Sequence, residues 1–411
     1  MILMRKNLHV PAKFSMSLLL VLAASQATAN TFSWDGSIEL EQRYFFDTQS
    51  DSFNNERGQT SAKLELEVFR DWNEGKDTFV LEPMVRVDSQ DDERSHADLR
   101  QFIWSHLEDD WELSAGLGRV FWGVTESQHL VDVVNQTDLV ENIDGEDKLG
   151  QPMVRFQYFH DLGTIDAYIL PLFRPRTFPS IKSRLSSDLG VAANNEVYES
   201  SQADNHIDFA LRYSQTLGVF DLGFSIFDGT SRDPDLFRLL DPASATTTPF
   251  YPQITQYGAD IQVTTGAWLL KFEGVERDFD DSFYDDYSAI TLGAEYTLVG
   301  LLGSTYDLGM LAEYSRDDRG ELATAPFQND LFLGARLALN DINSSEVLFG
   351  LVRDLDDSKS NSVFLEGSTR IADSVTANIE LRYFESVNPS DVLYGFRDDS
   401  FIQLGLQYFF D

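Results

Sequence analysis

The chain has 411 residues, with 68 Asp plus Glu against 31 Lys plus Arg and no cysteine, so its formal net charge is -37. So acidic a chain lacks the basic footprint that phosphate binding requires, and we expect no nucleic-acid partner. The absence of cysteine excludes disulfide scaffolds, cysteine zinc ligands and iron–sulfur clusters. Composition alone does not decide between two or three soluble domains and one long barrel.

The first 29 residues have the pattern of a leader for export. Three cations precede a short apolar core at 17–24, and a small-residue Ala-Thr-Ala motif ends at Ala29. The apolar run is too short to span a bilayer as a helix, which takes ~20 residues. We therefore expect residues 1–29 to be a cleaved signal peptide and 30–411 to be the mature protein. The alternative is a retained N-terminal anchor.

Beyond the leader, apolar residues recur at every second position. This alternation is clear in 62–68, 207–213, 331–339 and 375–383, where mostly polar or small residues stand between the apolar ones. In a β-strand, a period of two gives the sheet one apolar and one polar face. No later apolar stretch approaches the length of a spanning helix, which excludes helical membrane insertion. A soluble β-sandwich would alternate in the same way.

The lengths of the gaps between strands separate these two folds. Strand character is predicted at roughly 32–46, 60–70, 78–88, 96–107, 111–121, 152–160, 164–173, 206–215, 218–228, 254–264, 267–277, 287–299, 304–315, 329–339, 345–354, 361–371, 374–384 and 399–410. Tight turns such as 265–266 and 372–373 alternate with long acidic gaps such as 122–151, 174–205 and 229–253. Short turns at one end and long loops at the other are typical of outer-membrane barrels.

We therefore predict an all-β fold, an antiparallel transmembrane β-barrel of about eighteen strands. A tilted strand crosses the hydrocarbon in about 9–11 residues, which these segments supply. The sheet has to close, because lipid cannot satisfy an open edge. An even number of strands leaves both termini on the side of the short periplasmic turns, with the long loops extracellular.

The last strand carries a further signal. Gly405 is followed by Tyr408 and Phe410 on an alternating strand, which resembles the terminal assembly signal of Gram-negative outer-membrane proteins, although the chain ends on Asp411. With eighteen strands and a long third loop, the chain resembles the substrate-specific porins and the alginate-export barrels. The resemblance implies a place in the Gram-negative outer membrane, contact with its lipid and lipopolysaccharide, and insertion by the barrel assembly machinery. It leaves a homotrimer open as the oligomeric state.

The third long loop, 122–151, is the expected constriction. In porin-like proteins this loop folds into the lumen, where it would face the wall about nine strands away and meet Arg336. Loop carboxylates opposite wall arginines would set a transverse field that orients small polar solutes. The alternative is that the charges pair and fill the lumen. The expected constriction residues are Arg43, Arg86, Arg119, Arg212, Arg336, Arg370, Arg382, Glu82, Glu380, Glu126, Asp132, Glu141, Asp144 and Asp147.

The fourth long loop is locally basic. Arg174, Arg176, Lys182 and Arg184 are four cations within eleven residues of an acidic chain. They could form an anion funnel at the pore mouth. The alternatives are contact with lipopolysaccharide phosphate and pairing with neighbouring acidic loops.

Cofactors and catalysis are not indicated. The acidic clusters at 88–92, 278–286 and 354–357 have the oxygen ligands that Ca²⁺ or Mg²⁺ accepts, but not the spacing of a calcium-binding loop. We expect solvated loop tips that bind such ions weakly at most, and no metal centre or cofactor. No histidine lies in a recognisable catalytic or metal motif, so we do not expect an enzyme.

A passive, solute-selective outer-membrane channel is therefore the leading functional hypothesis, with a small polar solute as its ligand. The first alternative is an export barrel for an anionic polysaccharide, which would need an arginine-rich lumen. The second is a plugged structural or surface-interaction barrel. Inward-facing acidic and basic side chains nearly balance along the predicted strands, so the sign of ion selectivity stays open.

Overall fold

The structure is a computed structural model, and it describes residues 31–411 except for 48–55, 187–189, 242–245, 326 and 390. The predicted signal peptide at 1–29 lies outside the described residues. Within the described ranges, no helix is long and apolar enough to cross a membrane.

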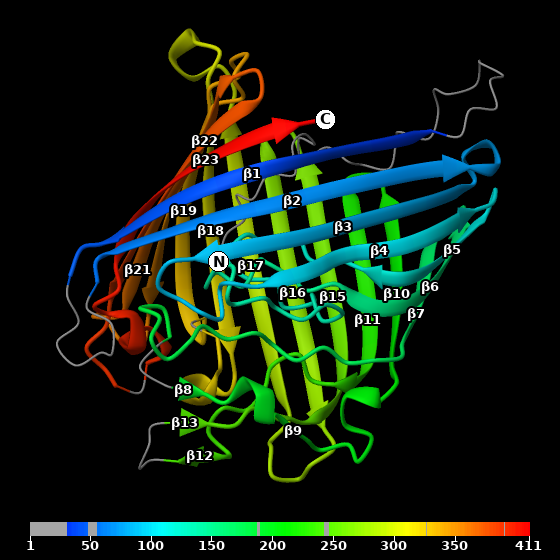
Figure 1. Ribbon diagram of the computed structural model, residues 1–411, viewed down its shortest axis with the longest axis horizontal. Helices are drawn as coiled ribbons and strands as arrows, with labels where there is room; N and C mark the ends of the chain where they lie inside the picture. Colours follow the sequence, from blue (N-terminus) through cyan, green and yellow to red (C-terminus); the bar gives the residue numbers. More distant parts are fainter. Residues whose placement is uncertain (1–30, 48–55, 187–189, 242–245, 326, 390) are drawn as a thin grey trace.

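Eighteen antiparallel strands form one closed sheet (Figure 1). They are β1 (Phe32–Phe45), β2 (Gly58–Trp72), β3 (Asp77–Asp88), β4 (Ala97–Leu107), β5 (Trp111–Gly118), β6 (Gln151–His160), β7 (Gly163–Leu170), β10 (Asp208–Leu217), β11 (Phe220–Thr230), β15 (Gln253–Thr265), β16 (Trp268–Phe279), β17 (Tyr287–Leu298), β18 (Asp307–Asp317), β19 (Asn329–Ala338), β20 (Glu346–Asp354), β21 (Asn361–Ala372), β22 (Val375–Glu385) and β23 (Phe401–Phe410). Each strand pairs with the next in the chain, and β1 pairs with β23 from Gly36↔Phe410 to Phe45↔Phe401. The predicted fold class is confirmed.

The two faces of the sheet are reversed relative to a soluble protein. On β1, the inward side chains of Glu39 and Arg43 are 8% and 4% exposed, whereas the outward side chains of Ile38 and Leu40 are 44% and 55% exposed. The period of two predicted this separation, and the predicted transmembrane barrel placed the charged face inward. An apolar outer wall around a polar interior is the arrangement that lipid selects. The polar face therefore lines the lumen.

Short turns lie at one end of the barrel and long loops at the other. The turn between β15 and β16 is only 266–267, and Gly266 adopts a left-handed backbone there (φ +60°). Loop 3 (119–150) joins β5 to β6, loop 4 (171–207) joins β7 to β10, and loop 5 (231–252) joins β11 to β15. Loops 4 and 5 pair through short strands in two small sheets at the loop end (Figure 1), formed by β8 (Gly190–Val191), β9 (Val197–Tyr198), β12 (Leu240–Asp241), β13 (Thr246–Thr247) and β14 (Phe250–Tyr251).

An arginine on the lipid-facing side of the closing strand β23 should destabilise the barrel. Leu406 lies in the middle of β23 with its side chain on the outer face, and we expect Leu406→Arg to cost about 2–4 kcal/mol of unfolding free energy in lipid vesicles. Gln407, the next residue, faces the lumen and donates a hydrogen bond to Ser37, so Gln407→Arg should cost far less. Urea titration of both variants in the same vesicles measures the difference. Equal losses would contradict the assignment of the two faces.

Candidate functional site: an inward loop and an acidic cavity

Loop 3 folds into the barrel and buries an apolar segment there. Val131, Val133 and Val134 are at most 2% exposed and join a cluster with Trp122 and Tyr168. A loop carries backbone polar groups that need partners once they leave water. The lumen wall supplies those partners, so polar contacts with the strands decide how the loop is held.

Two buried wall carboxylates hold the tip of loop 3. Glu273 on β16 accepts hydrogen bonds from the backbone N–H groups of Val124 (2.7 Å) and Thr125 (2.9 Å) and from the Thr125 hydroxyl (2.6 Å). Glu313 on β18 accepts from the backbone N–H of Glu126 (2.8 Å) and from the Ser127 N–H and hydroxyl, both at 2.7 Å. Hydrogen bonds to an ionised acceptor are about twice as strong as neutral ones. The loop is therefore anchored through its backbone.

Glu126 meets the arginine that the sequence placed opposite loop 3. Its carboxylate pairs with the guanidinium of Arg336 on β19 and with Lys271 Nζ at 3.4 Å. Burial alone would raise the pKa of Glu126, but the two cations lower it below the usual value. Glu126 therefore stays ionised while it is largely buried.

Residues 138–141 of loop 3 contact the part of the wall formed by β1, β3 and β4. Arg86 on β3 donates two hydrogen bonds to Glu141, both at 2.9 Å, and one to Glu41 on β1 at 2.6 Å. Arg100 on β4 donates to Asp138 at 2.6 Å. The bidentate contact gives geometric specificity as well as attraction. The loop thus spans from β1–β4 to the wall at β16–β19.

A third contact joins loop 3 to β21 and β22. Arg382 donates hydrogen bonds to Glu380 (2.7 Å) and Glu366 (2.5 Å), and its Nη2 lies 3.4 Å from Asp144 of loop 3. Asn142 donates a hydrogen bond to Asp144 at 2.8 Å. One arginine here faces three carboxylates.

Ionisable groups are also buried within loop 3 itself. His129 Nε2 lies 3.3 Å from Glu146, and its Nδ1 lies 3.9 Å from Glu273. Burial alone would lower the pKa of His129. The two carboxylates outweigh this effect and raise the pKa to about 9. Asp132 lies 3.4 Å from Lys148, and burial raises the Asp132 pKa although Lys148 opposes the shift. At neutral pH His129 therefore carries a charge that helps to hold the loop.

A cavity of about 780 Å³ lies between loop 3 and the wall formed by β1–β4 and β21–β23. Its lining is acidic, with twelve carboxylates and five cations, a formal net of seven negative charges. Arg86 and Arg94, which pair with Glu41 and Glu141 of the lining, offset two of these charges. The carboxylates are those of Asp35, Glu39, Glu41, Glu65, Glu67, Glu82, Glu141, Asp144, Glu146, Asp147, Glu366 and Glu380. The cations are those of Lys63, Arg100, Arg119, Lys148 and Arg382. Ion pairing around loop 3 thus leaves an excess of negative charge in the adjoining lumen.

The remaining residues of the predicted constriction are dispersed. Arg43 donates to the side chains of Gln403 and Gln59 near the closing seam, Arg119 pairs with Glu82, and Arg212 pairs with Asp260 on β15 at 2.8 Å. The Asp147 side chain lines the acidic cavity. Arg370 lies at the short-turn end of β21, beside a β-bulge. The structure therefore brings Arg86, Arg336 and Arg382 to carboxylates of loop 3. It also places the Arg212 guanidinium 5.2 Å from the centre of the Trp122 ring of that loop. Arg43 and Arg370 lie in other surroundings.

Three of the four predicted mouth cations, Arg174, Arg176 and Arg184, are paired with carboxylates. Arg174 donates a hydrogen bond to Asp98 on β4 at 2.7 Å, and Arg176 donates to Asp233 of loop 5 at 2.7 Å. The two arginines near Asp233, Arg176 and Arg277, hold its pKa well below the usual value against the effect of burial. These contacts fit the alternative of pairing with neighbouring acidic loops.

Arg184 extends loop 4 across the barrel mouth. It donates a hydrogen bond to Asp399 beside β23 at 2.7 Å, and its guanidinium lies 4.6 Å from the centre of the Phe45 ring at the end of β1. Loop 4 begins at β7, so this contact brings it to the closing seam. Lys182 is the exposed member of the predicted mouth set.

The wall anchors were not identified from the sequence. Alternation places Glu273 and Glu313 on the lumen face, together with Lys271, so the pattern could have marked them as lumenal. It carries no information about their partners, which are 142 to 187 residues away in the chain. Arg94, which donates to Glu41 (2.8 Å) and Asp88 (2.9 Å), lies in a short irregular loop with no periodic signal.

The predicted assembly signal lies on the strand that closes the barrel. Tyr408 is 51% exposed on the outer face, Phe410 pairs with Gly36, and Gly405 pairs with Glu41 of β1 and with Asn378 of β22. These positions lie on the strand that pairs with β1 and so closes the sheet. Recognition by an assembly machinery stays a prediction.

An eighteen-stranded closed barrel with an apolar exterior, a polar lumen and a third loop folded inward is the architecture of an outer-membrane porin-like barrel. The resemblance drawn from the sequence is thereby confirmed at the level of this class.

Comparisons with known proteins give only distant similarities. No family model matches the chain, and no curated protein matches it. A variant of the Rh. blastica porin is 12% identical, with 92% of this chain and 100% of that chain covered and a TM-score of 0.44. A loop-deletion variant of OmpT, an outer membrane protein of Vibrio cholerae, is 12% identical, with 93% and 100% covered and a TM-score of 0.45. Likenesses at this level carry no argument, so the class rests on the barrel itself.

Proposed function

We propose that this protein is a Gram-negative outer-membrane channel for passive diffusion of small polar solutes and ions, with a preference for cations. The observation that carries the proposal is the lumenal cavity, whose lining residues have a formal net of seven negative charges. A cleft lined by one sign of charge raises the local concentration of the opposite ion, and the low-dielectric protein around it focuses the field. Anions of similar size would be excluded to the same degree.

The same charge argues against the export of an anionic polysaccharide. A uronate chain would have to pass Asp35, Glu39, Glu65 and Glu67, whose like charges repel it. The arginines that could form a basic track, Arg86, Arg336 and Arg382 among them, are instead paired with carboxylates. Export is therefore the weaker hypothesis.

A plugged barrel is the second candidate, and one observation favours it. Loop 3 occupies the lumen, and loop 4 reaches from β7 to the closing seam through the Arg184–Asp399 contact. Two loops held by buried ion pairs could seal the barrel on the extracellular side. A plugged barrel would not conduct ions, whereas a channel would, so conductance distinguishes the two hypotheses.

We assign transport rather than catalysis, because the charged groups around loop 3 serve as its anchors. The proposed partners are outer-membrane lipid, lipopolysaccharide and the barrel assembly machinery, with a homotrimer as the oligomeric state to be tested. Lys182 is available for a lipopolysaccharide phosphate at the loop end. No cofactor is required for passive diffusion.

Single-channel recording in a planar bilayer tests the proposal. Stable current steps of uniform size are expected, and under a KCl gradient the reversal potential should have the sign of cation preference. A correctly folded barrel with no steps would support the plugged alternative. Steps with an anion-selective potential would overturn the cation preference while leaving the channel in place.

A further inference from the structure

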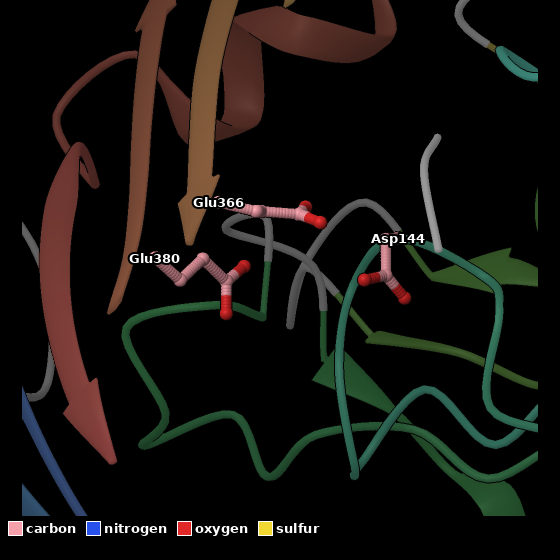
Figure 2. A group of neighbouring side chains, drawn as sticks. All are labelled: Asp144, Glu366 and Glu380. Carbon is pink, nitrogen blue, oxygen red and sulfur yellow. The ribbon is translucent and has the colours of Figure 1, made fainter. Parts of the chain in front are cut away.

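Three carboxylates from separate parts of the chain converge beside loop 3. Asp144 comes from loop 3, Glu366 from β21 and Glu380 from β22, and Figure 2 shows the three side chains pointing into one small space. One oxygen of each lies within 4.8 Å of the others. The side chains of Asp144 and Glu366 are only 8% and 7% exposed, and that of Glu380 is 13% exposed.

Arg382 does not balance the charge of this group. Its guanidinium is bonded to Glu380 and Glu366 and lies near Asp144, so three carboxylates and one arginine leave two negative charges. One oxygen of Glu366 accepts from Arg382, while its other oxygen, Oε2, is buried and has no hydrogen-bond partner among the described residues. A buried carboxylate oxygen without a partner is costly and points to a missing ligand.

The oxygen spacing fits a hard divalent cation. Ca²⁺ binds oxygen ligands at ~2.3–2.6 Å, so two oxygens on the same ion can be up to about 5 Å apart. The three oxygens here fall within that limit, and the charge of one such ion equals the excess negative charge of the group. Mg²⁺ requires a shorter, near-ideal octahedral shell and usually keeps several waters, so a group of three protein carboxylates favours Ca²⁺.

We propose that Asp144, Glu366 and Glu380 form a lumenal binding site for a divalent cation of the Ca²⁺ type. The site is distinct from the exposed acidic loop tips, because its ligands come from an inward loop and two adjacent wall strands. All three residues line the acidic cavity, which gives an ion a route of entry. The bound ion joins loop 3 to β21 and β22, and binding does not depend on whether the barrel conducts.

Calorimetric titration of the metal-free, folded protein in detergent with CaCl₂ tests the site. The wild type is expected to bind Ca²⁺ more tightly than Mg²⁺. Glu366→Gln keeps the shape of the side chain and removes its charge, and should eliminate one Ca²⁺ equivalent or weaken it roughly tenfold or more. Asp144→Asn should weaken Ca²⁺ binding to the same extent. Because Asp144 lies in loop 3 and not in a strand, this variant tests the site even if Glu366→Gln does not fold.

Glu67→Gln is the matched control, because Glu67 lines the same cavity on β2, outside the three-carboxylate group. It should retain the wild-type stoichiometry, with only the few-fold change in affinity that the loss of one distant cavity charge produces. The proposal is overturned if the folded wild type binds no Ca²⁺. It is also overturned if Asp144→Asn binds Ca²⁺ as tightly as the Glu67→Gln control does. Binding that only weakens equally in all variants would also overturn it, since that reports general cavity charge.

Discussion

Glu273→Ala combined with Glu313→Ala should release the tip of loop 3 and raise the single-channel conductance. The two carboxylates accept hydrogen bonds from the backbone N–H groups of Val124, Thr125 and Glu126, and alanine cannot accept them. Each buried donor left unpaired costs ~1–3 kcal/mol, so the docked position becomes less favourable by several kcal/mol. The wider lumen should also show larger current fluctuations as the loop moves.

The absence of native cysteine allows a direct measurement of the same event. Gln128 near the loop tip donates to Thr291 on β17, and Gln128→Cys introduces a single thiol at that position. A bulky maleimide should label this thiol much faster in the double variant than in the otherwise unchanged protein. Glu276→Ala is the control, since Glu276 lies on the same strand as Glu273 but is exposed, and it accepts a hydrogen bond from the Ser288 hydroxyl rather than from loop 3. Unchanged conductance and labelling in the double variant would contradict the anchoring role.

Asp35→Lys combined with Glu67→Lys should strongly reduce cation selectivity. The two residues are directly paired across β1 and β2, and both line the cavity. The double change adds four positive charges and reduces the net of the cavity lining from seven negative charges to three. At about 10 Å in water one charge contributes ~0.4 kcal/mol, so four change the local cation concentration by roughly tenfold at low salt. The effect should shrink above about 0.1 M salt, where screening acts within ~10 Å.

The reversal potential under a salt gradient measures this change. Asp280→Lys with Asp285→Lys adds the same charge in the loop between β16 and β17, away from the cavity lining, and should shift the potential far less. If both pairs shift it equally, the selectivity arises from the net charge of the protein and not from the cavity.

Local pattern was enough to locate the strands of this barrel. The run 331–339 falls on β19 (Asn329–Ala338), and 374–384 falls on β22 (Val375–Glu385), because alternation is a property of neighbouring residues. The predicted loop 122–151 corresponds to loop 3 at 119–150, with the small shift usual at element ends. Strand count and parity also placed Arg336 opposite this loop, where it pairs with Glu126.

The sequence by itself thus determined the strands and the end that bears the long loops, since each is encoded over a few successive residues. The inward path of loop 3 was expected from the resemblance to porin-like proteins. Only the tertiary structure decided that Glu273 and Glu313 hold the loop tip, that loop 4 reaches Asp399, and that excess acid lies in one cavity. Closing the sheet brings together side chains as far apart as Asp144 and Glu380. Their pairing depends on strand register and on the path of a loop through the lumen, and neither leaves a periodic trace in the chain.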